Sequence, residues 1–168
     1  MDYLTRHTIL KYGRSVLCSE EFRSTFSQVH HYSTTVGDHL LGVAAEAVKQ
    51  CRARGLTDDD TLKTVVLAAL CHDIGIMGRR KKYRNDAECL IRHPLDSVRA
   101  YIRITGEADE RVIDSIKCHM FPLKPAVPKY KAGWILTVAD KICSVNEKLG
   151  RSPVTEEDRK ELLIGKQH

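Results

Sequence analysis

Histidines and aspartates on apolar helix faces are the residues of this sequence that could do chemistry. Eight histidines are present, and some of them lie among apolar residues together with two aspartates. This group is His39, His72, Asp73, His93, His119 and Asp140. Burying a carboxylate among apolar side chains is costly unless it is paired or bound to a metal. Imidazole and carboxylate groups together bind divalent transition metals, so the pattern predicts a shared metal site.

Each of these residues also has a purely structural interpretation. A single histidine on an apolar face is commonly a hydrogen-bonded core residue, and a single aspartate in a helix is commonly solvated or capping. His72 at a helix end would interact favourably with the helix dipole. For all six residues to be purely structural, six independent coincidences would be needed. That combination is improbable, so we favour metal binding.

Helical periodicity dominates the segments that must position these residues. Apolar residues at three- and four-residue spacings mark one helix face over 36–48, and His39 lies on that face. Capping and breaking residues delimit the other helices. The expected helices span 57 to Gly75 or Gly78, 85–92, 94–105, 109–120, 132–148 and a short segment from 155. Residues 79–84 are expected to form a basic loop.

Strand signals are nearly absent, with no convincing alternation and no Asn-Gly or Asp-Gly turn. The predicted fold class is therefore all-α, a bundle of five or more helices. A length of 168 residues corresponds to one domain with a short appendage. We assign residues 1–150 to a helical metal-binding domain and residues 151–168 to a C-terminal helical appendage.

The composition predicts a soluble, cytoplasmic protein. Its net charge of +5 suits an anionic small molecule and is too weak to indicate nucleic acid. The longest apolar run, residues 65–71, is far shorter than the roughly 20 residues of a membrane span, so no membrane partner is expected. The six cysteines are scattered, and the polar N-terminal residues do not resemble an export signal. We therefore expect reduced thiols. The oligomeric state stays open.

The order of the candidate ligands resembles that of a known family. His39, then His72-Asp73, then Asp140 is similar to the pattern of the HD-domain superfamily of metal-dependent phosphohydrolases. The local string His72-Asp73-Ile74-Gly75 resembles its HDIG form, and segments 38–44 and 139–141 resemble the helices that carry its first and last ligands. The resemblance covers about residues 29–145 and implies a helical bundle.

The resemblance also implies a ligand arrangement. His39, His72, Asp73 and Asp140 would hold one metal, and Asp73 would bridge to a second. His93 and His119 resemble the extra pair of the subset that binds two metals. Two divalent transition-metal ions are therefore implied, Fe or Mn first, with Co, Ni or Zn as alternatives.

The implied activity is hydrolysis of a phosphoester or phosphoanhydride in a small metabolite or nucleotide, with a metal-activated hydroxide as nucleophile. Two alternatives remain open: a diiron oxygenase of the same superfamily, and a non-catalytic, metal-stabilised regulatory module. The cyclic-dinucleotide phosphodiesterases of the superfamily carry a Lys where this chain has Ile76 and a Gly-Tyr-Pro turn where it has 120–122. Cleavage of cyclic dinucleotides is therefore not implied.

Three further features have open roles. The basic segment after Asp73 is a candidate phosphate-binding rim or a solvated surface run; its charged residues are Arg79, Arg80, Lys81, Lys82 and Arg84. Lys141 is expected to point about 100° away from Asp140 on a helix. His30, His31 and Tyr32 either line the pocket or form a plain turn.

Overall fold

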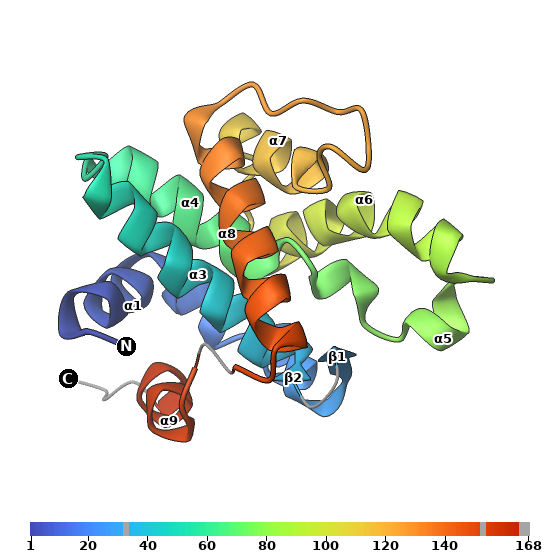
Figure 1. Cartoon of the computed structure of the whole chain (residues 1–168), viewed down its shortest axis with the longest axis horizontal. Helices are drawn as coiled ribbons and strands as arrows, with labels where there is room; N and C mark the ends of the chain where they lie inside the picture. Colours follow the sequence, from blue (N-terminus) through green and yellow to red (C-terminus); the bar gives the residue numbers. More distant parts are fainter. Residues whose placement is uncertain (32–33, 152–153, 165–168) are drawn as a thin grey trace.

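The computed structural model describes residues 1–31, 34–151 and 154–164, and these residues form an all-α domain (Figure 1). The predicted helical bundle is confirmed. Tyr32 lies outside the described residues. The division of the chain at residue 150 stays a prediction.

Three helices form the centre of the bundle: α3 (Val36–Ala53), α4 (Asp59–Cys71) and α8 (Lys131–Lys148). α3 packs against both of the others, and α7 (Glu110–Cys118) covers α4 and α8. From Leu62 to Cys71, α4 is buried at every residue except Lys63, as its continuous apolar sequence dictates. Removing this surface from water is the main stabilising contribution.

Side-chain caps begin α3 and α4. Thr35 accepts a hydrogen bond from the backbone N–H of Asp38, and Asp58 accepts one from Thr61. Such caps stabilise a helix by about 0.5–2 kcal/mol. The predicted start near residue 57 is therefore correct to within two residues.

The outer elements are α1 (Tyr3–Leu17), α2 (Glu20–Ser24), the 3₁₀ turn η1 (Thr25–Ser27) and α9 (Glu156–Ile164). α1 packs against α4 and α9. Asp158 of α9 accepts hydrogen bonds from the N-terminal amine and from Arg6. A two-stranded antiparallel ribbon, β1 (Val29–His31) with β2 (Thr34–Thr35), leads into α3. The sequence does not predict this ribbon, because strands this short show no alternation of apolar and polar residues.

Three predicted boundaries are wrong. α4 ends at Cys71, and not at Gly75, because Asp73 leaves the helical conformation (φ −116°, ψ 8°) before the 3₁₀ turn η2 (Ile74–Ile76). The segments 85–92 and 94–105 are one helix, α6 (Asp86–Thr105), with Pro94 inside it. The basic segment contains a one-turn helix, α5 (Arg79–Lys82), where a loop is predicted.

All six cysteines carry free thiols, as predicted. Within the described part of the chain, each helix is too short or too polar to cross a membrane.

Candidate metal centre

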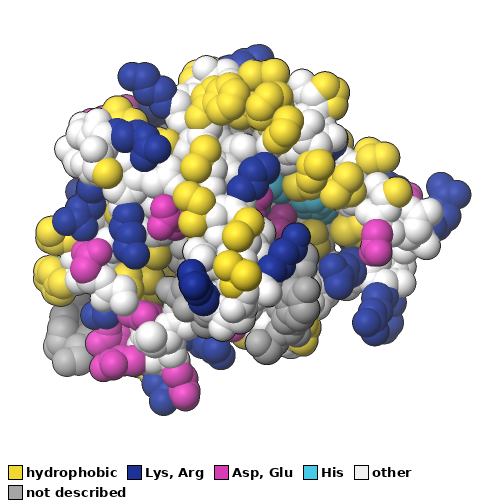
Figure 2. Space-filling view, in the orientation of Figure 1, with side chains coloured by type: hydrophobic (Ala, Val, Ile, Leu, Met, Phe, Trp, Pro, Cys, Tyr) yellow, Lys and Arg dark blue, Asp and Glu magenta, His cyan; other side chains and the backbone are white. Residues whose placement is uncertain are grey.

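The structure brings the six predicted ligands together from five parts of the fold. His39 lies in α3, His72 and Asp73 follow α4, His93 lies in α6, His119 follows α7 and Asp140 lies in α8. The four histidines are 0–4 % exposed. Histidine and acidic side chains are visible through an opening between α8 and α6 (Figure 2).

Asp73 stands at the centre of this cluster and its two oxygens face different histidines. Oδ1 lies 3.3 Å from Nε2 of His93 and 3.4 Å from Nε2 of His119. Oδ2 lies 3.7 Å from Nε2 of His72 and 4.0 Å from Nε2 of His39. The carboxylate therefore separates two pairs of imidazoles.

Asp140 faces only one of these pairs. Its Oδ1 lies 3.2 Å from Nε2 of His39 and 3.8 Å from Nε2 of His72. His39, His72 and Asp140 form one group whose ligand atoms lie within 4.8 Å of one another, and Asp73, His93 and His119 form another.

The imidazole rings are oriented by bonds at their outer nitrogen. Nδ1 lies 2.8 Å from the Ala69 carbonyl in His72, 2.9 Å from the Cys89 carbonyl in His93 and 2.7 Å from the Ile116 carbonyl in His119. A carbonyl oxygen only accepts, so each Nδ1 donates a proton to it and the other ring nitrogen, Nε2, points into the cluster. Metal-binding histidines are commonly held in this way.

His39 is oriented by a carboxylate. Its Nδ1 lies 2.8 Å from Oε1 of Glu147, and both side chains are fully buried. Glu147 was not recognised in the sequence analysis. It follows Asp140 by two helical turns and therefore shares its face of α8, which is the signal that could have identified it.

The electrostatics of the cluster favour a cation. Burial lowers the pKa of His39, but Asp140 and Glu147 outweigh it and raise the pKa to about 10. Burial would raise the pKa of Asp73, yet His72, His119 and His93 hold it well below the usual range. Burial would also raise the pKa of Asp140, but His39 and His72 outweigh it and lower that pKa. The carboxylates thus stay ionised and attract positive charge.

The donor atoms fit divalent transition metals. Nε2 of His39, Nε2 of His72 and Oδ1 of Asp73 are buried and make no well-formed hydrogen bond among the described residues. Donors about 2.0–2.2 Å from one ion lie about 2.8–4.4 Å from one another. The separations from Asp73 and Asp140 to the histidines, 3.2–4.0 Å, fall within that range.

Gly75 allows η2 to approach α6 closely. A Cβ at Gly75 would collide with the carbonyl oxygen of His93 and lie 2.6 Å from the backbone nitrogen of Ser97. The Gly75 N–H donates to Oγ of Ser97 at 2.9 Å. This contact brings Asp73 beside His93, so the glycine two residues after the aspartate has a packing role.

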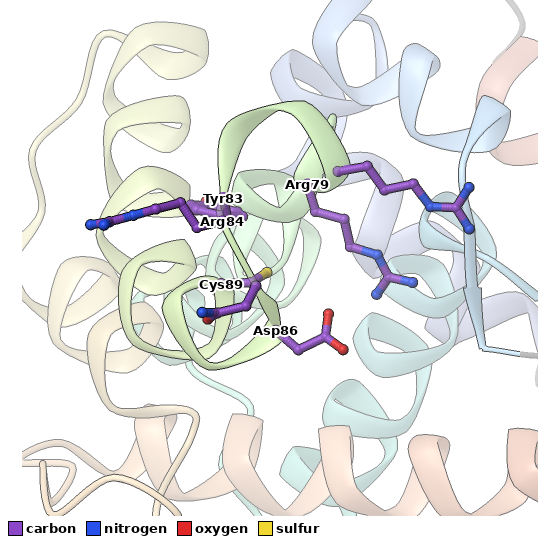
Figure 3. Close-up of a pocket in the computed structure, with 7 residues that line it drawn as sticks. Arg79, Tyr83, Arg84, Asp86 and Cys89 are labelled. Carbon is purple, nitrogen blue, oxygen red and sulfur yellow. The ribbon is translucent and has the colours of Figure 1, made fainter.

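The basic segment lines a separate pocket of about 380 Å³. Arg79 is half-buried, whereas Arg80, Lys81 and Arg84 are exposed. Figure 3 shows Arg84 pointing away from the side occupied by Arg79 and Asp86. None of the six predicted ligands is among the lining residues, which are Arg79, Arg80, Tyr83, Arg84, Asn85, Asp86 and Cys89.

Lys82 of the basic segment and Cys89 of the pocket connect this region to the cluster. Lys82 donates to the Gly75 carbonyl and pairs with Asp96, each at 3.0 Å, so it braces η2 against α6. Burial raises the pKa of the Cys89 thiol, with Arg79 opposing and Asp73 adding to the shift. Cys89 lines the pocket and also contacts the cluster, because its carbonyl accepts the hydrogen bond from Nδ1 of His93 at 2.9 Å.

Two residues with open roles reach the cluster. Lys141 approaches its edge, with Nζ 3.3 Å from the His119 carbonyl and 4.0 Å from Oδ2 of Asp140. Its long side chain thus bends back toward the site, against the expectation from helix geometry. Nε2 of His30 lies 3.1 Å from Oδ2 of Asp73. The sequence analysis left His30 open between pocket and turn.

Comparison with known families identifies the class of protein. The family model of the HD domain matches residues 36–145, and the chain belongs to this family. It is thereby placed in a superfamily of metal-dependent phosphohydrolases. Comparisons with curated proteins and with solved structures give no match.

Proposed function

We propose that this chain is a metal-dependent phosphohydrolase that cleaves a phosphoester or phosphoanhydride of a small metabolite or nucleotide. The observation that carries the proposal is Asp73, whose Oδ1 and Oδ2 face separate pairs of histidines. A carboxylate in that position is suited to bridge two ions, as phosphoryl hydrolysis by paired metals requires. Membership in the HD family supports the reaction class.

Different residues would hold the two ions. His39, His72, Asp73 and Asp140 would bind one, and Asp73 would share the other with His93 and His119. Imidazole and carboxylate donors bind several divalent transition metals. We propose Fe or Mn, with Co, Ni or Zn as alternatives. When bound, such ions lower the pKa of water enough to supply hydroxide near neutral pH.

The chain's basic residues would compensate the charge of the substrate. Lys141 extends its amine to the edge of the cluster. Arg79 and Arg80 line the neighbouring pocket and suit a second, non-reacting phosphate, because guanidinium groups bind phosphate in a bidentate manner. Lys81 and Arg84 would contribute positive potential, whereas Lys82 is engaged by Asp96 and Gly75.

The test combines metal analysis with a substrate screen. Protein reconstituted with Mn or Fe under anaerobic conditions is expected to bind about two ions per chain and to release phosphate from a phosphorylated metabolite or nucleotide. If no phosphate is released and the same protein, once exposed to air, consumes oxygen as the substrate is lost, the oxygenase is established instead. Two bound ions with no turnover across the screen would favour the regulatory module.

A further inference from the structure

His30 lies beside the metal centre but outside the residues that define the family. The HD model begins at residue 36, whereas His30 belongs to the preceding strand β1. Its side chain is 8 % exposed, and its Nε2 lies 3.1 Å from Oδ2 of Asp73. Its ring centroid lies 4.3 Å from that of His39.

The donor atoms of His30, His39 and Asp73 form a third group within 4.8 Å of one another. This group shares His39 with the group of Asp140 and shares Asp73 with the group of His93. The three groups are thus one continuous cluster. The separation between His30 and Asp73 also falls in the range of about 2.8–4.4 Å expected for donors to one ion.

The position of His30 is fixed by the segment that follows Asp73. The side-chain amide of Gln28 donates to the Ile76 carbonyl at 3.1 Å and accepts from the Gly78 N–H at 2.7 Å. The Gln28 carbonyl accepts from the Val36 N–H at 2.9 Å. Gln28 therefore joins β1 both to the loop after Asp73 and to the start of α3, so His30 is held between the elements that carry Asp73 and His39.

We propose that His30 is a further ligand to the ion held by His39, so that the two ions are bound unequally. The first ion then has five protein donors, from His30, His39, His72, Asp73 and Asp140. The second has three, from Asp73, His93 and His119. In six-coordinate geometry the first ion keeps about one open position and the second about three. The first ion is therefore bound more tightly, and the second is the one that admits water and substrate.

The first measurement needs no variant. Wild-type protein labelled with ¹⁵N-histidine is titrated with Zn²⁺, and the imidazoles whose nitrogen resonances shift on coordination are counted. Five coordinated rings support the proposal. Four coordinated rings, with His30 unshifted at saturation, overturn it.

The second measurement compares two substitutions at His30. Co²⁺ affinity is measured by chelator competition, and visible absorption reports the coordination of the first equivalent. We expect both His30→Ala and His30→Gln to weaken the tighter site at least tenfold and to change its spectrum, because a carboxamide is a poor ligand for these ions. His7→Ala, at a histidine on the exposed side of α1, is the control and should match wild type.

Two results would overturn the assignment. Wild-type affinity and spectrum in His30→Ala would remove His30 from the site. Wild-type affinity in His30→Gln alone would mean that His30 only donates a hydrogen bond to Asp73, which a carboxamide also provides. Circular dichroism of the metal-free variants checks folding. These readouts are independent of phosphate release, so failure of the proposed hydrolase activity would leave them unaffected.

Discussion

The metal cluster and the basic segment that follows Asp73 are built in opposite ways. The rings of the four histidines predicted as ligands are buried and held at Nδ1 by a carbonyl or by Glu147. The basic segment presents Arg80, Lys81 and Arg84 to solvent. A buried, oriented group keeps one geometry without a ligand, whereas an exposed cation gains geometry only when its partner binds. The cluster should therefore respond steeply to substitution and the segment weakly.

Asp73→Asn should have the largest effect, because it removes the charge that faces both histidine pairs. We expect metal affinity and turnover to fall by more than the roughly 10–100-fold that loss of an outer partner costs. Elemental analysis and phosphate release provide the measurements.

Asp60→Asn is the matched control, because it makes the same chemical change at an exposed position in α4. It should leave both quantities unchanged. Near-normal turnover in Asp73→Asn would remove this residue from the mechanism.

Glu147→Gln should have the next largest effect, since it replaces the carboxylate that orients His39. The amide keeps the shape but loses the charge, so we expect metal affinity to fall about 10–100-fold with the fold intact. Chelator competition measures the affinity, and Glu157→Gln on the exposed side of α9 is the control. Equal affinities would show that the ring of His39 is held by packing alone.

Much of the cluster could be predicted from the sequence, for a physical reason. Metal ligands are restricted to a few residue types, and buried ones stand out among apolar neighbours, as His39 does in α3. Glu147 was not predicted, and the role of His30 was left open, because the importance of both residues depends on tertiary contacts. Glu147 becomes a partner only when α8 packs on α3, and His30 only when Gln28 joins β1 to η2.

The helix boundaries show the same limit. The sequence predicts that a new helix starts at Pro94, because the first helical turn is a common position for proline. The structure continues α6 through it, with η2 packed closely at His93 and Ser97. The sequence predicts that α4 ends near Gly75, whereas Gly75 is needed for the packing of η2 against α6. Local propensity therefore identified Pro94 and Gly75 as special positions, but it assigned both of them to helix boundaries, which is wrong.

Gly75→Ala should lower stability, because the added Cβ must displace backbone of α6. Overpacking of this kind costs about 1–3 kcal/mol, measured by denaturant unfolding of the metal-free protein. It should also weaken metal binding, since the shift separates Asp73 from His93.

Gly106→Ala, at the end of α6, is the informative comparison for this prediction. Its φ of 70° makes any side chain strained, but a Cβ there meets open space. A penalty of about 1–2 kcal/mol is expected, without any change in metal affinity. Loss of affinity in both variants would indicate a general loosening rather than a specific contact between η2 and α6.

The paired substitution Arg79→Ala/Arg80→Ala should have the smallest effect. Because Arg80 is exposed and Arg79 half-buried, each lost contact costs about 0.2–1 kcal/mol, and the pair raises KM by roughly two- to thirtyfold. The increase should shrink for a generic substrate with a single phosphate, and it should shrink at high salt, which screens exposed charges. Arg14→Ala/Arg151→Ala removes the same charge from exposed positions elsewhere and should leave KM unchanged. Equal kcat/KM for the two double variants and wild type on the phosphorylated substrate would make the basic segment a solvated surface. A loss as large as that of Asp73→Asn would mean that the segment closes over the cluster when substrate binds.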